Sequence, residues 1–467
     1  MVAPLTPPEH LPDGRLETRM QELKPPLDAA GALLEANRCL YCHDAPCIEA
    51  CPTGINIPEF IRKIATGNLR GAARTIFEEN ILGHSCARVC PVEVLCQGAC
   101  VYNNEGHPPI QIGRLQRYAT DHVISRGIQL FRRGSPSGWK VGIIGAGPAG
   151  LACAHRLTRL GHQVTLFEAR RVPGGLNTTG VAPYKMHAET SLEEYRYIAE
   201  IGFEIRCGLR VGEHVTREDL EREFAALFIG VGLGPDGFLS IPGDRLEGVV
   251  GAVALIERIK LDPTLDLSDV RRALVIGGGN TAIDVARQLA KLEVPEVTLL
   301  YRRDDKTMSA YPHEWAQAKA EGVRAIWHAL PEQILGTEGH VDRVRCVRVA
   351  LSDDGRRFEP VMDSQFYVPA DLVVMAIGQE RISSLFHDLG IAFEKGKVKV
   401  DPVTHQTSNP RYFAGGDCVN GGKEVVNAAE EGKKAALGID AFLRTLKSTG
   451  RPVNLTQKDE NNGRSAH

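Results

Sequence analysis

The residues best suited to chemistry in this chain are eight cysteines between Cys39 and Cys100. The first four are separated by two, four and three residues, and a proline follows the last of them: Cys39, Cys42, Cys47 and Cys51. In a run of this kind, three closely spaced thiolates hold one four-iron cluster, and the thiolate before the proline ligates a second cluster. The other four, which could complete both sites, are Cys86, Cys90, Cys96 and Cys100. The spacing therefore predicts two [4Fe-4S] clusters in a segment that carries electrons.

Zinc and disulfides are the alternatives for these cysteines. The run CLYCHDAPCIEACP resembles that of bacterial ferredoxins. Zinc sites commonly use paired CxxC units, but CxxC occurs only once here. Crowded cysteines fit metal ligation in a reducing compartment better than a secreted disulfide scaffold. Four scattered cysteines are expected to be small core residues: Cys153, Cys207, Cys346 and Cys418.

Length and charge exclude several classes of function. The chain has 467 residues, enough for two to four domains, and a formal net charge of -3, which provides no basic surface for nucleic acid. The N-terminal residues contain no apolar stretch of the signal-peptide type, and no apolar run approaches transmembrane length. We therefore expect a cytoplasmic protein without nucleic-acid or membrane partners.

Helical patterns surround the cysteines. Apolar residues recur at helical spacing in three segments, residues 29–37, 58–66 and 69–80, and a further helix is expected through Gln116 and Tyr118. A proline-rich irregular arm, residues 1–28, precedes them, and a polar linker at residues 132–138 follows. This pattern predicts an α-helical double [4Fe-4S] domain over residues 1–136.

A dinucleotide motif follows the linker. The stretch KVGIIGAGPAGLACAHRLTRLGHQVTLFEAR reads as a strand, a glycine turn, a helix and a second strand that ends on Glu168. In GxGxxG, the first glycine makes the turn, the second admits the pyrophosphate and the third lets helix and strand pack. The terminal Glu168 can accept hydrogen bonds from a ribose. The motif residues are Gly145, Ala146, Gly147, Pro148, Ala149 and Gly150.

A second unit of the same form appears in RALVIGGGNTAIDVARQLAKLEVPEVTLLYRRD. Gly277 and Gly279 keep the first two glycines, and Ala282 takes the third place, which tolerates alanine. The second strand ends on arginines, Arg302 and Arg303, which could bind a 2′-phosphate. We interpret the unit as a nicotinamide dinucleotide site whose charge suggests NADP, with an unliganded surface arginine pair as the alternative.

Two further glycine sites point to the flavin. Gly174 and Gly175 would let backbone approach a flat ring, unless they form only a flexible loop, and Asp417 in RYFAGGDCVNGGKEVV is placed to bind a polyol chain unless it is an unliganded loop residue. Together with the first unit, these sites resemble the two-dinucleotide-binding flavoproteins, in which the aspartate contacts FAD. The segments at residues 228–235 and 373–380 have the form of crossings between nucleotide domains.

The expected fold is thus an α-helical N-terminal iron-sulfur domain followed by two α/β Rossmann-like dinucleotide-binding domains, with the FAD domain split by the inserted NAD(P) domain. The expected ranges are 137–258 and 370–446 for the two parts of the FAD domain, 259–369 for the NAD(P) domain, and 447–467 for a disordered tail.

This order of motifs resembles two families: dihydropyrimidine dehydrogenase, in its N-terminal half or its bacterial NAD(P)/FAD-binding iron-sulfur subunit, and the glutamate synthase small subunit. The cysteine region is similar to the former nearly throughout. The chain also has Gln116 in IGRLQRYATD, where dihydropyrimidine dehydrogenases use a glutamine as a cluster ligand and glutamate synthases typically have glutamate. A surface helix residue is the alternative for Gln116.

The resemblance implies a sorting of the ligands. One cluster would be held by Cys39, Cys42, Cys47 and Cys100, and the other by Cys51, Cys90, Cys96 and Gln116, which leaves Cys86 spare or as a rival to Gln116. The FAD contacts implied are the first glycine turn with Glu168, Gly175, Leu176, Lys185, Val211, Gly416 and Asp417. The implied nicotinamide contacts are Gly277, Gly278, Gly279, Asn280, Thr281, Arg302, Arg303, Ala376, Ile377 and Gly378. Ser309 stands where the mammalian NADPH-using enzyme has a further arginine, so the choice between NAD and NADP stays open.

The function implied is an electron-input subunit. NAD(P)H, FAD and two [4Fe-4S] clusters would connect to a partner, an FMN-containing, pyrimidine-binding iron-sulfur subunit that reduces uracil or thymine or performs the reverse reaction. We see no candidate FMN barrel in these residues and nominate no catalytic acid or base, because the cofactors carry the reaction. The alternatives are a glutamate synthase small subunit and a metal-binding assembly protein with structural dinucleotide sites.

Overall fold

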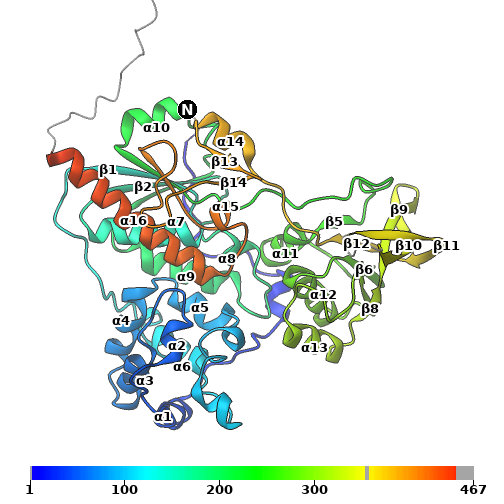
Figure 1. Cartoon of the computed structure of the whole chain (residues 1–467), viewed down its shortest axis with the longest axis horizontal. Coiled ribbons are helices and arrows are strands. Elements are labelled where there is room, and N and C mark those ends of the chain that lie inside the picture. Colours follow the sequence, from blue (N-terminus) through cyan, green and yellow to red (C-terminus); the bar gives the residue numbers. More distant parts are fainter. Residues whose placement is uncertain (1–2, 353–356, 449–467) are drawn as a thin grey trace, which may run out of the picture.

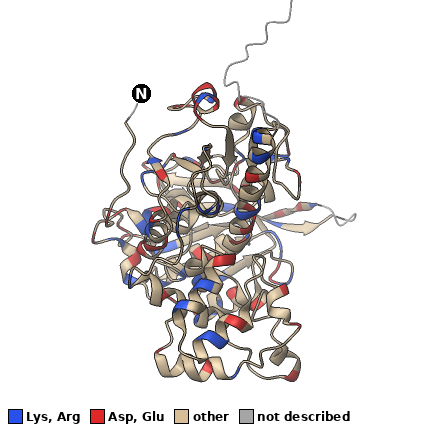
Figure 2. Ribbon diagram, turned by 90° about the vertical axis from the view of Figure 1, so that its left-hand side faces the viewer, with Lys and Arg blue, Asp and Glu red and all other residues tan. Residues whose placement is uncertain are grey.

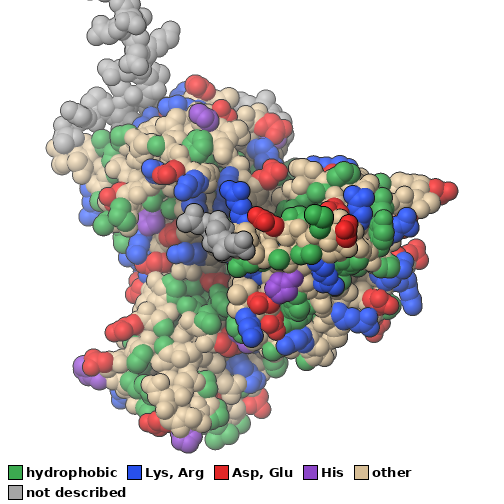
Figure 3. All heavy atoms as spheres, turned by 45° about the vertical axis from the view of Figure 1, so that its right-hand side comes forward, with side chains coloured by type: hydrophobic (Ala, Val, Ile, Leu, Met, Phe, Trp, Pro, Cys, Tyr) green, Lys and Arg blue, Asp and Glu red, His purple; other side chains and the backbone are tan. Residues whose placement is uncertain are grey.

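A computed structural model describes residues 3–352 and 357–448. The chain forms three bodies: a helical body, a body built on a first parallel sheet, and a body built on a second parallel sheet (Figure 1). A space-filling view shows them as lobes, with charged and hydrophobic side chains mixed on the face in view (Figure 3). The ribbon likewise shows acidic and basic residues interspersed along the elements (Figure 2). The part of the predicted tail beyond Ser448 lies outside the described residues.

The helical body contains the eight clustered cysteines. Its helices begin where local chemistry caps them: the side chains of Asp28, Asn56 and Asn68 accept the backbone N–H three residues on, at 2.7, 3.2 and 2.9 Å. The elements are α1 (Ala29–Asn37), α2 (Pro46–Glu49), α3 (Ile57–Ala65), α4 (Leu69–Glu79), α5 (Gly83–Val89), η2 (Val92–Val94), η3 (Val101–Glu105) and α6 (Ile112–Ile124). The helices expected at residues 29–37, 58–66, 69–80 and around Gln116 all form.

The first sheet is entirely parallel, in the order β15-β4-β1-β2-β3. Its apolar strands are covered on both faces, as parallel sheets require. Val141 and Ile143 pack toward α7 and α16 in a core shared with the helical body, while Ile144 packs on the opposite face with Leu220 and Phe386. The strands are β1 (Lys140–Ile144), β2 (Gln163–Glu168), β3 (Glu204–Cys207), β4 (Ala226–Ile229) and β15 (Tyr412–Ala414). The helices are α7 (Pro148–Arg159), α8 (Leu176–Thr179), α9 (Ala188–Ala199), α10 (Arg217–Glu223), α14 (Ser383–Asp388), α15 (Asp417–Asn420) and α16 (Val425–Ser448).

The second sheet is also parallel, in the order β5-β12-β6-β7-β8. Ala273 and Val275 face the helices, and Leu274 and Ile276 face an antiparallel three-stranded sheet that covers the other side. The strands are β5 (Val249–Gly251), β6 (Arg272–Ile276), β7 (Glu296–Tyr301), β8 (Arg324–Trp327) and β12 (Leu372–Met375), and the helices are α11 (Ala252–Leu261), α12 (Asn280–Lys291) and α13 (Pro312–Ala320). The antiparallel sheet consists of β9 (Ala329–Thr337), β10 (His340–Leu351) and β11 (Phe358–Pro369), and β13 (Phe393–Glu394) pairs with β14 (Lys397–Val398) elsewhere.

The sheets divide the chain differently from the expected ranges. β5 and β12 pair with each other, and β12 also pairs with β6. Residues 249–258 and 370–375, expected in the FAD domain, therefore belong to the second body. The reason is physical: β12 is a short, fully buried apolar strand that suits the interior of either parallel sheet, so its pattern does not tell which sheet it joins.

The N-terminal arm is irregular, as expected, apart from η1 (Leu16–Arg19), but it does not pack with the helical body alone. The amide of Leu5 donates to the Cys207 carbonyl on the edge strand β3 at 2.8 Å. Leu16 and Met20 enter the core of the second body. The arm therefore joins all three bodies. None of the helices in the described ranges is both long and apolar enough to span a bilayer.

Candidate functional site

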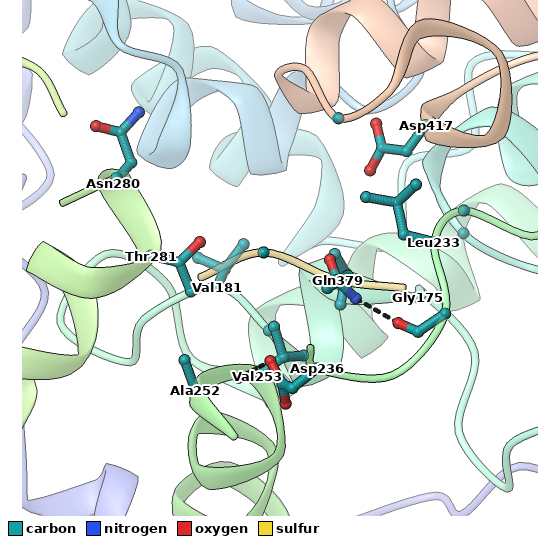
Figure 4. A pocket seen from close by; sticks show the side chains of 18 of the residues that line it. Gly175, Val181, Leu233, Asp236, Ala252, Val253, Asn280, Thr281, Gln379 and Asp417 are labelled. Carbon is teal, nitrogen blue, oxygen red and sulfur yellow. Dashed lines mark hydrogen bonds between the residues drawn. The ribbon is translucent and has the colours of Figure 1, made fainter. Parts of the chain in front are cut away.

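A single cavity of about 1970 Å³ lies between the two parallel sheets and is lined by both glycine turns. Pockets for one small ligand usually measure about 300–1,000 Å³, so this volume suits two dinucleotides. It opens at the carboxyl ends of parallel strands, where α/β sheets bind ligands. Figure 4 shows Asn280 and Thr281 of the second body on one side of the cavity, and Asp417 with Leu233 of the first body on the other.

Each of the three glycines in the first turn serves a different geometric purpose. Gly145 has φ of +100°, and a Cβ there would lie 2.5 Å from the Gly230 carbonyl oxygen. A Cβ on Gly150 would lie 2.0 Å from the Gly145 oxygen, so this glycine permits close packing of α7. A Cβ on Gly147 would approach only the Gly175 Cα, at 3.8 Å. Gly147 therefore faces open cavity, which is the space a pyrophosphate needs at the start of α7.

Glu168 lies at the end of β2 and lines the same cavity. Its carboxylate accepts from the backbone N–H of Ala146 and of Arg170, each at 2.8 Å, and the residue is 7% exposed. These bonds fix the carboxylate beside the glycine turn, where it can receive ribose hydroxyls. Pro148 and Ala149 also line the cavity, whereas Ala146 and Gly150 are buried behind it.

The remaining predicted flavin contacts surround the same space. Gly175, Leu176, Lys185, Val211, Gly416 and Asp417 all line the cavity. Asp417 begins α15, and burial raises the pKa of its carboxyl group. Asn177, which the sequence reading missed, also lines the cavity; it is 1% exposed, and neither amide atom has a hydrogen-bond partner among the described residues. An unpaired buried amide is costly, so Asn177 is suited to bind a polar ligand edge.

The second glycine turn repeats the first. Gly277 has φ of +148°, and a Cβ there would lie 2.2 Å from the Ala376 carbonyl oxygen. Gly279 precedes α12 as Gly147 precedes α7, and Ala282 is fully buried at the third position. The middle glycine again lines the cavity, and the Ser309 hydroxyl, which donates to the Gly278 carbonyl at 3.3 Å, would lie 3.6 Å from a Cβ on Gly279.

The two predicted arginines point differently. Arg302 is exposed and lines the cavity. Arg303 does not line it; its guanidinium lies 5.9 Å from the centre of the Phe358 ring. The structure therefore does not bring the pair together as a clasp, and only Arg302 is placed to meet a dinucleotide. The other predicted contacts, Gly278, Asn280, Thr281, Ala376, Ile377 and Gly378, do line the cavity.

The chain crosses between the bodies twice, and the two crossings are bonded to each other. The Gly237 amide donates to the Gly378 carbonyl at 2.9 Å. The Gln379 side chain donates to the Gly234 carbonyl at 2.8 Å, and Figure 4 shows this second bond. Asp236 accepts from the backbone N–H of Val253 at the start of α11 at 3.0 Å. The crossings thus form the floor between the two halves of the cavity.

Lys185 links the two nucleotide bodies. Its ammonium lies 2.7 Å from the Asp284 carboxylate on α12 and 2.8 Å from the Glu314 carboxylate on α13. Although burial opposes it, these carboxylates raise the pKa of Lys185, so the ammonium stays charged in the cavity wall. No sequence pattern singles out Asp284 or Glu314, because both are ordinary polar positions on amphipathic helices.

The first predicted cysteine set converges. Cys39, Cys42, Cys47 and Cys100 line one small pocket with Ile57, Ile61 and other apolar side chains. Burial and the charges of Cys39, Cys100 and Cys42 raise the pKa of Cys47 to about 12. Thiolates held so closely repel one another without a cation, so the group suits a positively charged iron-sulfur core.

The second set converges around Cys90. The pKa of Cys90 is raised by a hydrogen bond with Cys86, by burial and by the charges of Cys86, Cys96 and Cys51. Cys86 is therefore beside this set rather than apart from it, and the Asn80 amide donates to its sulfur at 3.2 Å. Gln116 is buried, and its amide nitrogen donates to the Gly83 carbonyl at 2.7 Å, one turn before Cys86, so only its amide oxygen could serve as the predicted ligand atom.

These sets fit clusters better than single ions. In the described part of the chain, no three His, Cys, Asp or Glu side chains converge tightly enough to hold one metal ion. The cysteines of each set can instead bind the separate irons of a four-iron cluster, so both sets suit clusters. The second set also reaches the dinucleotide cavity, because Cys90, Arg88 and Pro91 are among its lining residues.

Comparison with known families agrees with this arrangement. A family described as dihydropyrimidine dehydrogenase domain II, 4Fe-4S cluster, matches residues 16–128, and one described as pyridine nucleotide-disulphide oxidoreductase matches residues 139–432. The chain belongs to the pyridine nucleotide-disulphide oxidoreductases. It is an NAD(P)-dependent flavoprotein oxidoreductase with an iron-sulfur domain, and the predicted fold class is confirmed. The number of clusters and the individual site residues remain predictions.

Two curated relatives cover nearly the whole chain. The NAD-dependent dihydropyrimidine dehydrogenase subunit PreT of Escherichia coli (strain K12) is 35% identical over 424 residues, which are 91% of this chain and 97% of the relative. The glutamate synthase [NADPH] small chain of Halomonas elongata is 35% identical over 457 residues, 93% of this chain and 96% of the relative. The solved structure of FprA from Mycobacterium tuberculosis (His57Gln mutant) shares the fold, with a TM-score of 0.56 and 22% identity over 67% of this chain and 86% of that one.

Proposed function

We propose that this chain is the electron-input subunit of a dihydropyrimidine dehydrogenase. It would move electrons between NAD(P)H and, through FAD and two [4Fe-4S] clusters, a partner subunit that reduces uracil or thymine to the 5,6-dihydro forms or catalyses the reverse. The similarity to the dihydropyrimidine dehydrogenase subunit PreT and the matched cluster domain support this choice of substrate class. An FMN-containing, pyrimidine-binding iron-sulfur subunit is the partner we propose.

One observation carries the proposal: a single cavity is lined by both glycine turns and by Cys90. The same space therefore connects the nicotinamide side, the flavin side and the second cysteine set. When bound, FAD takes a hydride from NAD(P)H and releases electrons singly, which is the conversion that iron-sulfur clusters need. A chain built only for hydride transfer would have no need for cysteine ligands at that wall.

The chain's own residues orient the ligands and exclude water. Gly147 and Gly279 let two pyrophosphates approach the starts of α7 and α12, and Glu168 receives a ribose. Lys185 supplies a fixed positive charge between the two bodies. We propose NAD rather than NADP as the preferred nicotinamide, because Arg303 lies beside Phe358 and the neutral Ser309 brings no positive charge for a 2′-phosphate.

A reconstitution experiment tests the division of labour. The chain, purified without oxygen, should show flavin bands and iron, and should oxidise NAD(P)H with an artificial acceptor. It should not reduce uracil or thymine until the partner subunit is added. Pyrimidine turnover by the chain alone, or a colourless preparation without flavin, would refute the proposal.

The second candidate is a glutamate synthase small subunit. The Halomonas relative favours it, because that protein matches this chain over a similar length and at the same identity. Both candidates share the NAD(P)H, FAD and cluster path, so only the partner separates them. Adding a glutaminase-bearing large chain and measuring glutamate formation distinguishes the two. For either function we propose a cytoplasmic location, where thiols stay reduced.

A further inference from the structure

A buried carboxylate on the flavin-side body holds the helix that ends at Cys90. Glu194 lies on α9 and is 1% exposed. One of its oxygens accepts from the backbone N–H of His84 at 2.9 Å and of Ser85 at 3.0 Å, and the other accepts from the Ser85 hydroxyl. All three donors belong to α5, so every bond crosses from the first body to the helical body.

The held helix leads directly to the second cysteine set. α5 carries Cys86 and runs into Cys90, whose amide donates to the Cys86 carbonyl at 3.1 Å. At the other end, Lys24 of the N-terminal arm donates to the Cys90 carbonyl at 3.2 Å. Figure 1 shows α5 directly below α9, at the junction of the two bodies. The position of Cys90 at the cavity wall is thus set by residues outside the helical body.

We propose that Glu194 is a positioning residue for electron transfer, which fixes α5, and with it the Cys90 cluster site, at the flavin cavity and adds a negative charge near that cluster. The inference rests on the proposed function only in requiring a cluster at Cys51, Cys90 and Cys96. Glu194 does not itself line the cavity, so its role is separate from dinucleotide binding.

A buried carboxylate is costly, which argues that the contact is specific. Burial raises the pKa of Glu194 to about 7, against the opposing bonds from Ser85 and His84 and the charge of Arg88. A neutral amide would make the same contacts with less desolvation. Above that pKa, the acid therefore places charge as well as shape between the flavin side and the cluster site.

Three variants separate contact from charge. Glu194→Gln keeps an oxygen for the two amides and a polar group for Ser85 but removes the charge; Glu194→Ala removes both. Glu193→Gln is the matched control, because Glu193 is the neighbouring residue on α9 and its carboxylate acts on α5 only through the charge of Arg88, with no hydrogen bond to α5 among the described residues. The holoprotein is used throughout, at about pH 8.5, where Glu194 is ionised.

The readouts are hydrogen exchange at His84 and Ser85 and the midpoint potential of the cluster from paramagnetic resonance titration. In Glu194→Ala, amide protection at both residues should fall about tenfold or more. In Glu194→Gln, protection should stay near wild type while the potential becomes more positive, because loss of a nearby negative charge favours the reduced cluster. Glu193→Gln should shift the potential less.

The inference is overturned if Glu194→Ala keeps wild-type protection, or if Glu194→Gln and Glu193→Gln give the same potential. Because Glu194→Gln preserves the bonding pattern, the test does not depend on whether Glu194→Ala folds. Bleaching of the flavin by NADH is followed in the same samples. A wild-type protein that lacks flavin or cluster signals would overturn the proposed function instead.

Discussion

The two glycine turns have nearly the same backbone but different surroundings. The middle glycine has φ of -76° and ψ of -177° at Gly147, and φ of -96° and ψ of 176° at Gly279. Each begins a 12-residue helix, and each first glycine would collide with the carbonyl oxygen of a neighbouring strand end if it had a Cβ. The turn itself therefore does not decide which dinucleotide binds.

The difference lies in what faces each turn. Gly147 looks onto open cavity and the Gly175 backbone, and the strand beside it ends on a fixed carboxylate, Glu168. Gly279 lies near the Ser309 hydroxyl, and the strand beside it ends on Tyr301, directly before Arg302. The first turn thus offers a fixed carboxylate to its ligand, and the second offers a hydroxyl and an exposed arginine.

The largest expected effect comes from filling the first turn. Gly147→Ala should leave the fold intact, since its backbone angles suit alanine and its Cβ would meet only the Gly175 Cα at 3.8 Å. The methyl group would occupy the space of the pyrophosphate and weaken FAD binding about tenfold or more. The flavin absorbance of the purified protein and its melting temperature measure the two outcomes. The matched variant Gly279→Ala should keep its flavin and raise the KM for NADH; flavin loss in both variants would show that the turns are not independent.

A smaller effect is expected from substituting Glu168, which ends the strand beside the first turn. In Glu168→Gln, one amide N–H would face the backbone N–H of Ala146 or Arg170, which the carboxylate now accepts at 2.8 Å. We expect FAD affinity to fall about tenfold, because a buried donor loses its partner. Equilibrium dialysis of FAD measures this, and unchanged affinity would mean that Glu168 supports the turn but does not touch the ligand.

Substitutions of Arg302 and Arg303, which follow β7, should differ in their effect on nicotinamide use. Arg302→Ala should lower kcat/KM for NADPH about fivefold to tenfold and change that for NADH less, because only a 2′-phosphate needs the charge. Arg303→Ala should change neither, since its guanidinium lies near Phe358 and outside the cavity. Steady-state kinetics with both nucleotides compare the pair. Equal losses in the two variants would restore the predicted two-arginine clasp.

Local patterns predicted most of the helices and strands, because each strand, turn and helix is set by neighbouring residues. α1 covers the expected residues 29–37, and β2 ends at Glu168 as its pattern predicts. The assignment of β12 failed for the same reason: a buried apolar strand looks alike in either sheet.

Contacts between distant segments could not be predicted. The arm gave only a proline-rich composition, yet Glu17 is fully buried and accepts from the Ala188 amide at 3.1 Å. The bonds of Glu194 to α5 and of Lys185 to Asp284 join residues about a hundred positions apart, and one sequence carries no record of such pairs. The direction of Arg303 depends on packing against Phe358, which the dipeptide pattern does not contain.

A substitution of Lys260, at the seam between the two nucleotide bodies, should affect dinucleotide binding least and should change the stability of the protein instead. Lys260 on α11 is fully buried, and its ammonium donates to the carbonyls of Val181 and Met186 on the flavin side at 2.8 Å each. Burial lowers its pKa to about 8, although the charges of Glu17 and Glu22 oppose this. Lys260 therefore joins the bodies at a cost in desolvation that depends on pH.

The sign of that dependence follows from proton binding. Below pH 8, Lys260 is charged in both the folded and the unfolded state. Between about pH 8 and 10.5, the unfolded state binds more protons than the folded state. The stability of the protein therefore rises with pH over this range. Relative to Lys260→Met, the wild type should gain about 1–3 kcal/mol of unfolding free energy over this range. Urea unfolding of both proteins from pH 7 to 10.5 measures the difference. A constant difference would mean that burial does not lower the pKa of Lys260, so that its ammonium brings no pH-dependent cost to the seam.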